Sequence, residues 1–227
     1  MLQSDPKIRW RDVLKFVGQL NHDLRNQLNA IELQSAFLGE IVEPAEVKKE
    51  IIRLREMTSE LAAQLQRLTN SLAKIQPSTM TYRAREFVED LRAKLASDQP
   101  EQAAAVGWKI SLGEETIEID PQLLQEAFEE LIANAFTHGR GEGALVFEAY
   151  GAGPSIEFVL REPKTKFEGT TDEWGARPLG KVRHGHYALG LHRARGIFEA
   201  HHGSLQAEFD PATSVLTTTI ALPRVAD

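Results

Sequence analysis

Residues 8–41 read IRWRDVLKFVGQLNHDLRNQLNAIELQSAFLGEI, and apolar side chains recur through this stretch at helical spacing. Intervals of three and four residues place these side chains on one face of an amphipathic helix. The apolar positions are Trp10, Val13, Leu14, Val17, Leu20, Leu24, Leu28, Ile31, Phe37, Leu38 and Ile41. Glu43-Pro44 ends the pattern, because proline lacks a backbone donor and suits the first turn of a new helix. A second stripe from Val47 to Ile75 then predicts an antiparallel helical hairpin.

The hairpin by itself leaves much of its apolar surface in water. Two copies would complete a four-helix bundle, so the sequence predicts a homodimer. Docking of the hairpin onto a second domain of the same chain is the alternative.

The remainder of the chain has a mixed pattern. Gln76-Pro77-Ser78 is the expected linker, which gives domains 1–76 and 79–227. Helices are expected at 85–96, 121–137 and 188–201. Asp120 is the expected N-cap of the helix at 121–137, and Pro121 lies in its first turn. Strands are expected at 108–112, 116–119, 144–150, 155–160, 204–209 and 215–222. This order predicts the α+β class: the hairpin, then a sandwich with helices on one face of a mostly antiparallel sheet.

Bulk composition excludes several classes of function. The 227 residues carry a net charge of −7, which gives no basic footprint for nucleic acid or anionic lipid. The chain has no cysteine, so it has no disulfide framework and no thiolate zinc site. No apolar run approaches the roughly 20 residues that span a bilayer, and the N-terminus lacks the layout of a signal peptide. We therefore expect a cytoplasmic protein without membrane insertion or nucleic-acid partner.

His22 interrupts the first stripe and has polar neighbours that could serve chemistry. A histidine can attack phosphorus through one ring nitrogen if the other is held as a hydrogen-bond donor, and Asp23 is placed to hold it. Asn26 lies one turn along the same helix face, where its amide could orient a water. The spacing alone is more typical of a solvated helix histidine with ordinary polar neighbours.

The sequence around His22 decides between these interpretations. Residues 16–31, FVGQLNHDLRNQLNAI, resemble the H box of histidine kinases. The resemblance implies that His22 is the phosphoacceptor, Asp23 its acid/base partner, and Asn26 the polar residue of phosphatase activity toward a response regulator. Gln27 stands where the family usually has proline, which should straighten the helix locally without removing a chemical group.

The second half resembles the same family. Residues 130–139, ELIANAFTHG, resemble the N box of the ATP-binding fold shared by histidine kinases, gyrases, Hsp90 chaperones and MutL. The resemblance implies nucleotide binding by Glu130, Asn134 and His138, with Asn134 coordinating Mg²⁺; the alternative is that Asn134 is an ordinary polar residue near the helix end. Spacing of four residues lets Glu130 and Asn134 face one phosphate site.

Two later motifs continue this order. Residues 185–191, GHYALGL, resemble the G2 box, which implies that Gly185, Gly190 and Leu191 contact the nucleotide. Glycines at a helix start let backbone amides approach phosphates. Ala188 stands at a family glycine, and His202 replaces another at the turn after the helix. Together the motifs imply an ATP-binding sandwich of the histidine kinase type.

The G1 box is missing. A family member would follow the strand at 155–160 with an aspartate that holds the adenine amino group, but here the chain continues Arg161-Glu162-Pro163-Lys164. Arg161 falls nearest that position and cannot accept a hydrogen bond, whereas Glu162 could reach the same donor with a longer arm.

Other nucleotide contacts also depart from the family pattern. Thr137 replaces a phosphate-facing lysine, and residues 167–180 show no clear F box. Basic side chains that could supply phosphate charge, or belong to an idle solvated loop, are Lys164, Lys166, Lys181 and Arg183.

Three interpretations of function follow. The first is a two-component histidine kinase that uses Mg²⁺ and ATP to phosphorylate His22 and passes the group to an aspartate of a response regulator receiver domain. The second is a histidine phosphotransferase of a phosphorelay, which needs no cofactor. The third is a phosphatase or scaffold for a response regulator. Since the hairpin starts within ten residues of Met1, we expect the input signal to come from a sensor protein in trans.

Overall fold

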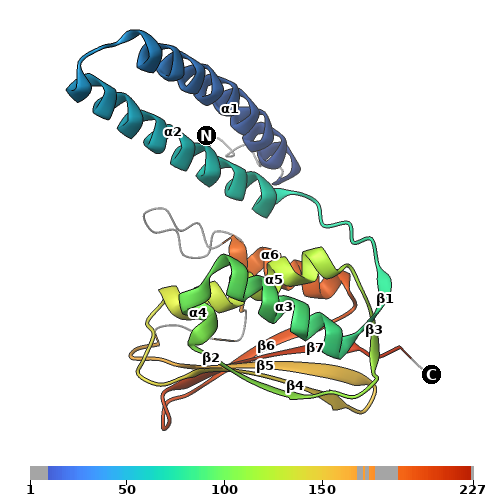
Figure 1. The fold of residues 1–227 in the computed structure, drawn as a ribbon. Coiled ribbons are helices and arrows are strands. Elements are labelled where there is room, and N and C mark those ends of the chain that lie inside the picture. The colour runs from blue at the N-terminus through green and yellow to red at the C-terminus, as the bar shows by residue number, and fades with distance from the viewer. Residues whose placement is uncertain (1–9, 168–170, 172–173, 177–188, 226–227) are drawn as a thin grey trace, which may run out of the picture. The chain divides into compact units, whose positions relative to one another are not determined.

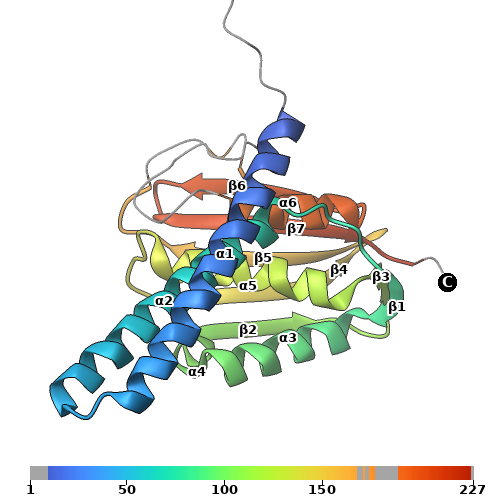
Figure 2. The ribbon, with the colours of Figure 1, turned by 90° about the horizontal axis from the view of Figure 1, so that it is seen from above.

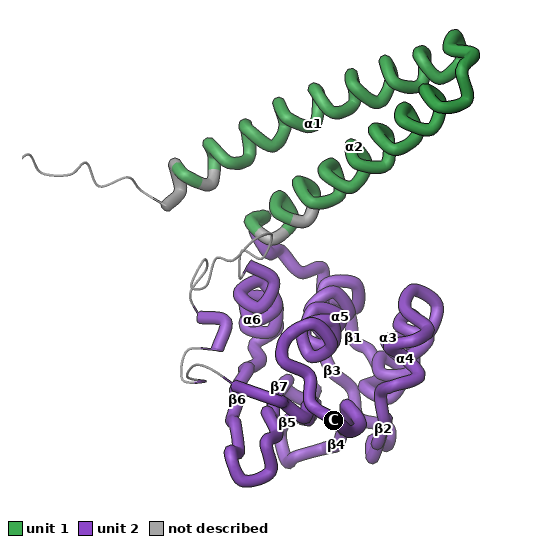
Figure 3. Tube along the Cα trace, turned by 90° about the vertical axis from the view of Figure 1, so that its left-hand side faces the viewer, with its two compact units in different colours: residues 1–73 green, residues 74–227 purple. Residues whose placement is uncertain are grey.

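The computed structural model describes residues 10–167, 171, 174–176 and 189–225 (Figure 1). The chain divides into two compact units, residues 1–73 and 74–227 (Figure 3). The expected linker Gln76-Pro77-Ser78 falls inside the second unit, where Ile75 already packs against the core. The predictions that concern Lys181, Arg183, Gly185 and Ala188 lie outside the described residues.

The first unit is a helical hairpin of α1, Trp10–Ile41, and α2, Ala45–Leu72. Pro44 precedes α2 with an extended backbone, as its fixed φ favours. The most buried positions repeat every seven residues along each helix, the period of two helices that pack along their length. These positions are Asn21, Leu28 and Ser35 on α1 and Ile51 and Thr58 on α2. Three of them are polar, which leaves the seam poorer in apolar contacts than the sequence pattern suggests.

The described residues of the second unit form two sheets. A five-stranded sheet has the order β2-β4-β5-β7-β6, in which β2 and β4 are parallel and the other pairs are antiparallel. Its strands are β2 Val106–Ser111, β4 Leu145–Ala152, β5 Ser155–Pro163, β6 Ser204–Asp210 and β7 Val215–Pro223. A separate antiparallel pair joins β1, Met80–Arg83, to β3, Thr116–Ile119. The fold is therefore α+β with a mixed sheet.

Helices cover one face of the larger sheet (Figures 1 and 2). They are α3 Ala84–Asp98, the short α4 Pro100–Ala104, α5 Pro121–Thr137 and α6 Gly190–Ala200. Asp120 caps α5 by accepting hydrogen bonds from the backbone N–H groups of Gln122 and Leu123, both at 3.1 Å. Pro121 occupies the first turn, where a missing N–H costs nothing.

The core lies between these helices and the sheet, and Phe128 of α5 is at its centre. Its ring lies 5.8 Å from that of Phe87 on α3, 5.1 Å from Phe158 on β5 and 5.2 Å from Phe198 on α6, between ring centroids. All four side chains are fully buried. Each such ring contributes about 1.5–3 kcal/mol by leaving water, so this cluster fixes α5 against its neighbours.

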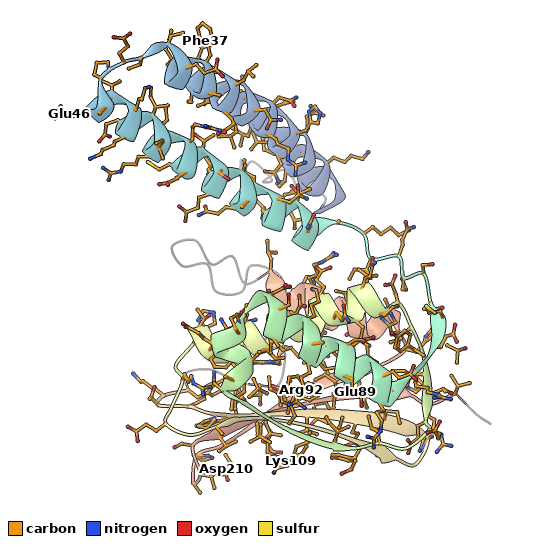
Figure 4. All side chains as sticks on the ribbon, in the orientation of Figure 1. Phe37, Glu46, Glu89, Arg92, Lys109 and Asp210 are labelled. Carbon is orange, nitrogen blue, oxygen red and sulfur yellow. The ribbon has the colours of Figure 1, made fainter. Side chains whose placement is uncertain are left out.

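The opposite face of the sheet is polar. Glu148 of β4 forms ion pairs with Lys109 of β2, labelled in Figure 4, and with Arg161 of β5. Arg161 also donates to Thr217 Oγ1 of β7. A face crossed by charged pairs is a solvent face, because an antiparallel sheet commonly buries only one side.

The expected elements are present with shifted ends, and two elements were not expected. The strand β1 is only four residues long with three exposed side chains, so it has no apolar alternation to detect. The helix α4 has five residues, none of them buried. None of the helices in the described part of the chain is long and apolar enough to cross a membrane.

Candidate functional site

His22 lies on an exposed flank of α1. Its side chain is 67% exposed, and its Nδ1 lies 3.3 Å from Oδ1 of Asp23. Nδ2 of Asn26 lies 3.4 Å from the same ring nitrogen. Asp23 is itself held by Gln19, whose Nε2 donates to Oδ1 at 2.9 Å. The structure therefore brings together the three residues that the sequence singled out on this helix.

The contacts of Nδ1 bear on where His22 can react. If Nδ1 carries the proton and donates to Asp23, the lone pair is on Nε2, at the outer end of the ring. The amide of Asn26 can then turn its oxygen toward Nδ1, since amide nitrogen and oxygen are assigned from hydrogen bonding. Asp23 thus favours the tautomer in which Nε2 is the nucleophile.

In the second unit, Glu130, Asn134 and Gly190 come together. Asn134 Nδ2 donates to Glu130 Oε1 at 2.9 Å, one turn apart on α5. A Cβ added at Gly190 would displace the Glu130 carboxylate, so this carboxylate lies directly against the start of α6. A carboxylate beside a helix N-terminus is stabilised by the helix dipole. Carboxylate and amide oxygens are ligands that Mg²⁺ accepts, so this end of the site fits the implied metal.

The surroundings of Glu162 do not leave its carboxylate available to accept a hydrogen bond from the amino group of adenine. Glu162 is 5% exposed, and its carboxylate forms an ion pair with the equally buried Lys164, at 2.8 Å from Nζ. Lys164 Nζ also donates to the carbonyl of His138, at the end of α5, at 2.7 Å. Burial raises the pKa of Glu162, although the ammonium of Lys164 opposes this effect. The Glu162 carboxylate is therefore already paired with a buried side chain of the same protein, Lys164.

The segments around this pair lie close together. Gly141 N–H donates to Pro163 O at 2.7 Å, and Thr165 N–H donates to Gly139 O at 3.0 Å. A Cβ at Gly141 would meet the backbone of Lys164 at 2.9 Å. The chain after α5 is thus bonded to the end of β5, in the region where the resemblance locates adenine binding.

Arg161 does not lie where the sequence comparison located it. Side chains alternate along a strand, and β5 turns Phe158 and Glu162 toward the helices. Arg161 lies on the opposite face with Glu148 and Thr217. The residue at the adenine end is consequently Glu162, and the nearness of Arg161 in sequence is not nearness in space.

Other predicted site residues have ordinary structural contacts. Thr137 Oγ1 donates to Ala133 O at 2.8 Å, a bond within its own helix. Leu191 packs against the core. The backbone N–H of His138 donates to Asn134 O at 3.0 Å and so closes α5. Gly185 lies outside the described residues.

Two contacts of the second unit are not among the expectations from sequence. Lys164 was expected to supply phosphate charge or to belong to an idle loop, yet it pairs with Glu162, and its spacing of two from Glu162 puts both on one face of a strand. His201 is 3% exposed; its Nδ1 lies 2.7 Å from Ile197 O, and its Nε2 accepts from Asp120 N–H at 2.9 Å. That bond joins α6 to the start of α5, and only the tertiary structure could show it.

Mg²⁺ with ATP, the cofactor that the resemblance implies, fits the second unit in part. The Glu130–Asn134 end offers oxygen ligands beside a helix start. The adenine end offers a carboxylate already neutralised by Lys164. An ammonium has donors only, so it cannot accept the adenine amino group's hydrogen bond and competes for the carboxylate that could. Among the residues that the structure describes, those at the Mg²⁺ end fit the cofactor and those at the adenine end do not.

No protein-family model and no curated protein matches this chain. Among solved structures, full-length ShkA in complex with AMPPNP has a TM-score of 0.72 at 16% identity, over 94% of this chain and 46% of ShkA. The histidine kinase AdeS of Acinetobacter baumannii has a TM-score of 0.52 at 21% identity, over 89% of this chain and 97% of AdeS.

The catalytic domain of the histidine kinase ThkA has a TM-score of 0.52 at 11% identity, over 64% of this chain and 95% of that domain. This chain spans less than half the length of ShkA. At these identities the similarity concerns the fold, and the fold of this chain is that of the catalytic regions of histidine kinases.

Proposed function

We propose that this protein is a histidine phosphotransfer protein of two-component signalling, which exchanges a phosphoryl group between His22 and the aspartate of a response regulator receiver domain. The supporting observation is the exposed His22 ring with Asp23 against Nδ1. The histidine kinase fold supports the same signalling class.

The proposed transfer needs only His22 and its neighbours on this side of the reaction. The lone pair of Nε2 attacks the phosphorus of the receiver's aspartyl phosphate, a P–N bond forms, and the P–O bond to the carboxyl group breaks. The receiver's aspartate leaves as a carboxylate. Asp23 holds the Nδ1 proton and stabilises the positive ring that results. The reverse sequence passes the group to another receiver.

A phosphorylated receiver is the proposed source of the phosphoryl group, because the adenine end is engaged by the Glu162–Lys164 pair. The competing function is a kinase that takes the group from ATP. It is favoured by the Glu130–Asn134 hydrogen bond at the Mg²⁺ end and by the AMPPNP bound to ShkA.

A homodimer formed by the hairpin is part of this proposal. Large apolar side chains are exposed along both helices: Phe16, Leu20, Ile31, Leu33, Phe37, Leu38, Ile41, Val47, Ile52, Leu54, Met57 and Leu61. Phe37, labelled in Figure 4, is 54% exposed. A monomer rarely exposes so many large apolar side chains on one pair of helices, and a second hairpin would bury many of them in a four-helix bundle.

Labelling separates the two sources of the phosphoryl group. Purified protein is incubated with Mg²⁺ and γ-labelled ATP, and separately with a labelled phosphoreceiver, and acid-labile label on this chain is followed. We expect label from the receiver, none from ATP, and none on His22→Ala. His202→Gly, which removes an exposed histidine of the second unit, should be labelled as wild type.

Each other outcome overturns part of the proposal. Label from ATP on wild type but not on His22→Ala would establish the kinase and defeat the relay from receivers alone. Absence of His22-dependent label in both arms would defeat both functions. Label that persists on His22→Ala would show that another residue is the acceptor.

A further inference from the structure

Asn21, the residue before His22, is buried in the seam of the hairpin. It is 5% exposed, and its Nδ2 donates to Oγ1 of Thr69 on α2 at 3.0 Å. The Thr69 hydroxyl in turn donates to Leu65 O at 2.9 Å, so it serves as both donor and acceptor. A polar side chain beside the phosphoacceptor thus bonds directly to the opposite helix.

Thr58 also carries a hydroxyl in the seam, but its hydrogen bond differs from that of the half-buried Thr69. It donates to Leu54 O at 2.8 Å within its own helix, an arrangement that needs no partner on α1. The described hydrogen bond from Arg55 to Glu32 also joins the two helices, but both of its side chains are 40% exposed or more. The Asn21–Thr69 bond is therefore distinguished by its burial and its position.

The position of the Asn21–Thr69 bond matters because it is far from the loop that connects α1 to α2. Near the loop, Gly39 packs against Ile51, with a Cβ-to-Cγ2 distance of 3.8 Å for a Cβ built on Gly39. His22 lies nineteen residues before Ile41, the end of α1, which is about 28 Å along a helix. A seam contact beside His22 therefore bears more directly on the orientation of His22 than the packing near the loop does.

Asn21 influences the rotation of α1 through helix geometry. Neighbouring helix residues are about 100° apart around the axis, so α1 turns His22 to its flank when it turns Asn21 toward α2. Displacement of α1 along or around its axis would separate the Asn21 amide from the Thr69 hydroxyl. A buried amide without a partner is unfavourable, so this bond adds to the packing of the other seam residues in favouring the observed register and rotation.

We propose that Asn21 is a positioning residue: through Thr69 it sets the rotation of α1 so that His22 presents Nε2 to the incoming phosphoryl group. This inference rests on the proposed function of His22 and extends it to α2. It assigns no chemical step to Asn21, which acts through the placement of His22.

The test compares two threonine variants that each remove one hydroxyl from α2, at the half-buried Thr69 and at the buried Thr58. Thr69→Val removes the bond across the seam, whereas Thr58→Val removes a bond within one helix. Thr69→Ser restores the hydroxyl, and Asn21→Leu breaks the same bond from α1 with an apolar side chain of similar size. For each variant, kcat and KM for transfer from a phosphorylated receiver are measured, with helix content by circular dichroism and labelling of His22 by the small donor phosphoramidate.

We expect Thr69→Val and Asn21→Leu to lower kcat at least tenfold with KM within about twofold of wild type, because displacement of a reacting atom by about 1 Å is costly. Thr58→Val and Thr69→Ser should keep the wild-type kcat. The rate at which phosphoramidate labels His22 should stay within about twofold of wild type in all four variants. A small, freely diffusing donor does not need a fixed orientation of His22.

The outcomes distinguish the positioning role of Asn21 from the proposed phosphotransfer function of His22. Equal kcat for Thr69→Val and Thr58→Val, or a kcat that follows helix content, would overturn the positioning role. A rise in KM with unchanged kcat would also overturn it, since the residue would then act on docking. If wild type takes no label from either donor, the proposed function of His22 fails instead.

Discussion

At the scale of single residues, Asp120 carries three hydrogen bonds from backbone N–H groups. Two come from Gln122 and Leu123 at the start of α5, and the third comes from Ser78 at 2.9 Å. Burial alone would raise the pKa of Asp120, but these three bonds outweigh it and lower the pKa below its ordinary value of 3.8. The ionised carboxylate therefore stabilises the folded state.

We predict that Asp120→Ala lowers the free energy of unfolding by about 2 kcal/mol near neutral pH, the upper range for loss of an N-cap. Asp120→Asn should lower the free energy of unfolding by less, because the asparagine Oδ1 still accepts hydrogen bonds from the backbone N–H groups at the start of α5. A carboxylate with a lowered pKa stabilises above the unfolded value and stops doing so as pH falls through the folded value. The difference between wild type and Asp120→Asn should thus be constant above pH 3.8 and shrink below it. Urea unfolding at several pH values measures it, and a difference that grows in acid would contradict the assignment.

The turn after α6 provides a second prediction. His202 has a left-handed φ of 59°, whereas at Gly203 an added Cβ would lie 2.5 Å from Leu222 Cδ2 and 2.7 Å from Ala221 O. We expect Gly203→Ala to cost about 2 kcal/mol of unfolding free energy by overpacking. His202→Gly should change it by less than about 0.5 kcal/mol, since relief of the backbone offsets the extra freedom of the unfolded chain. Thermal and urea unfolding test the pair, and equal losses would show that the turn tolerates neither change.

At the scale of elements, the buried Glu162–Lys164 pair connects the end of β5 to the end of α5. Lys164 reaches the His138 carbonyl, and burial raises the pKa of Glu162 despite the nearby ammonium. Removing one partner of a buried pair leaves the other charge without compensation. Replacing both by apolar side chains removes the desolvation cost together with the attraction.

We predict that Glu162→Gln lowers the free energy of unfolding by about 3 kcal/mol, whereas Glu162→Met combined with Lys164→Met stays within about 1 kcal/mol of wild type. A carboxyl group with a raised pKa favours folding most below its ordinary value of 4.5 and loses that contribution as pH rises through the folded value. Wild type should therefore lose stability relative to the double variant as pH increases above 4.5. A flat difference across this range would show that Glu162 ionises in the fold as it does in water.

At the scale of the whole molecule, the exposed apolar side chains of the hairpin govern assembly. Val47, Leu54 and Leu61 are spaced by seven on α2 and are each at least 44% exposed. This spacing places them on one stripe, the pattern of a helix that packs against another.

We predict a dimer by light scattering at micromolar concentration, with twice the 25.3 kDa mass of one chain. Leu54→Lys with Leu61→Lys should weaken dimerisation at least 100-fold, because each buried leucine contributes about 1.5–3 kcal/mol. Glu89→Lys, on the exposed face of α3 (Figure 4), adds positive charge in the second unit and serves as the control. A monomeric wild type would refute the four-helix bundle.

The sequence by itself determined the helices, the strands and the neighbours of His22. Helical and strand periods are local, and Asp23 and Asn26 follow His22 at spacings that any helix brings together. The Glu130–Asn134 hydrogen bond was predictable for the same reason. Elements without such a pattern, such as β1 and α4, could not be found this way.

Only the tertiary structure decided which face of each element is buried and what it meets there. Alternation along β5 separates Arg161 from Glu162, but packing against α5 decides that Glu162 faces inward. The bonds from Asn21 to Thr69 and from Asp120 to His201 join residues 48 and 81 positions apart. Such contacts depend on the register and packing of whole elements, so short-range spacing around His22 cannot specify what holds His22 in place.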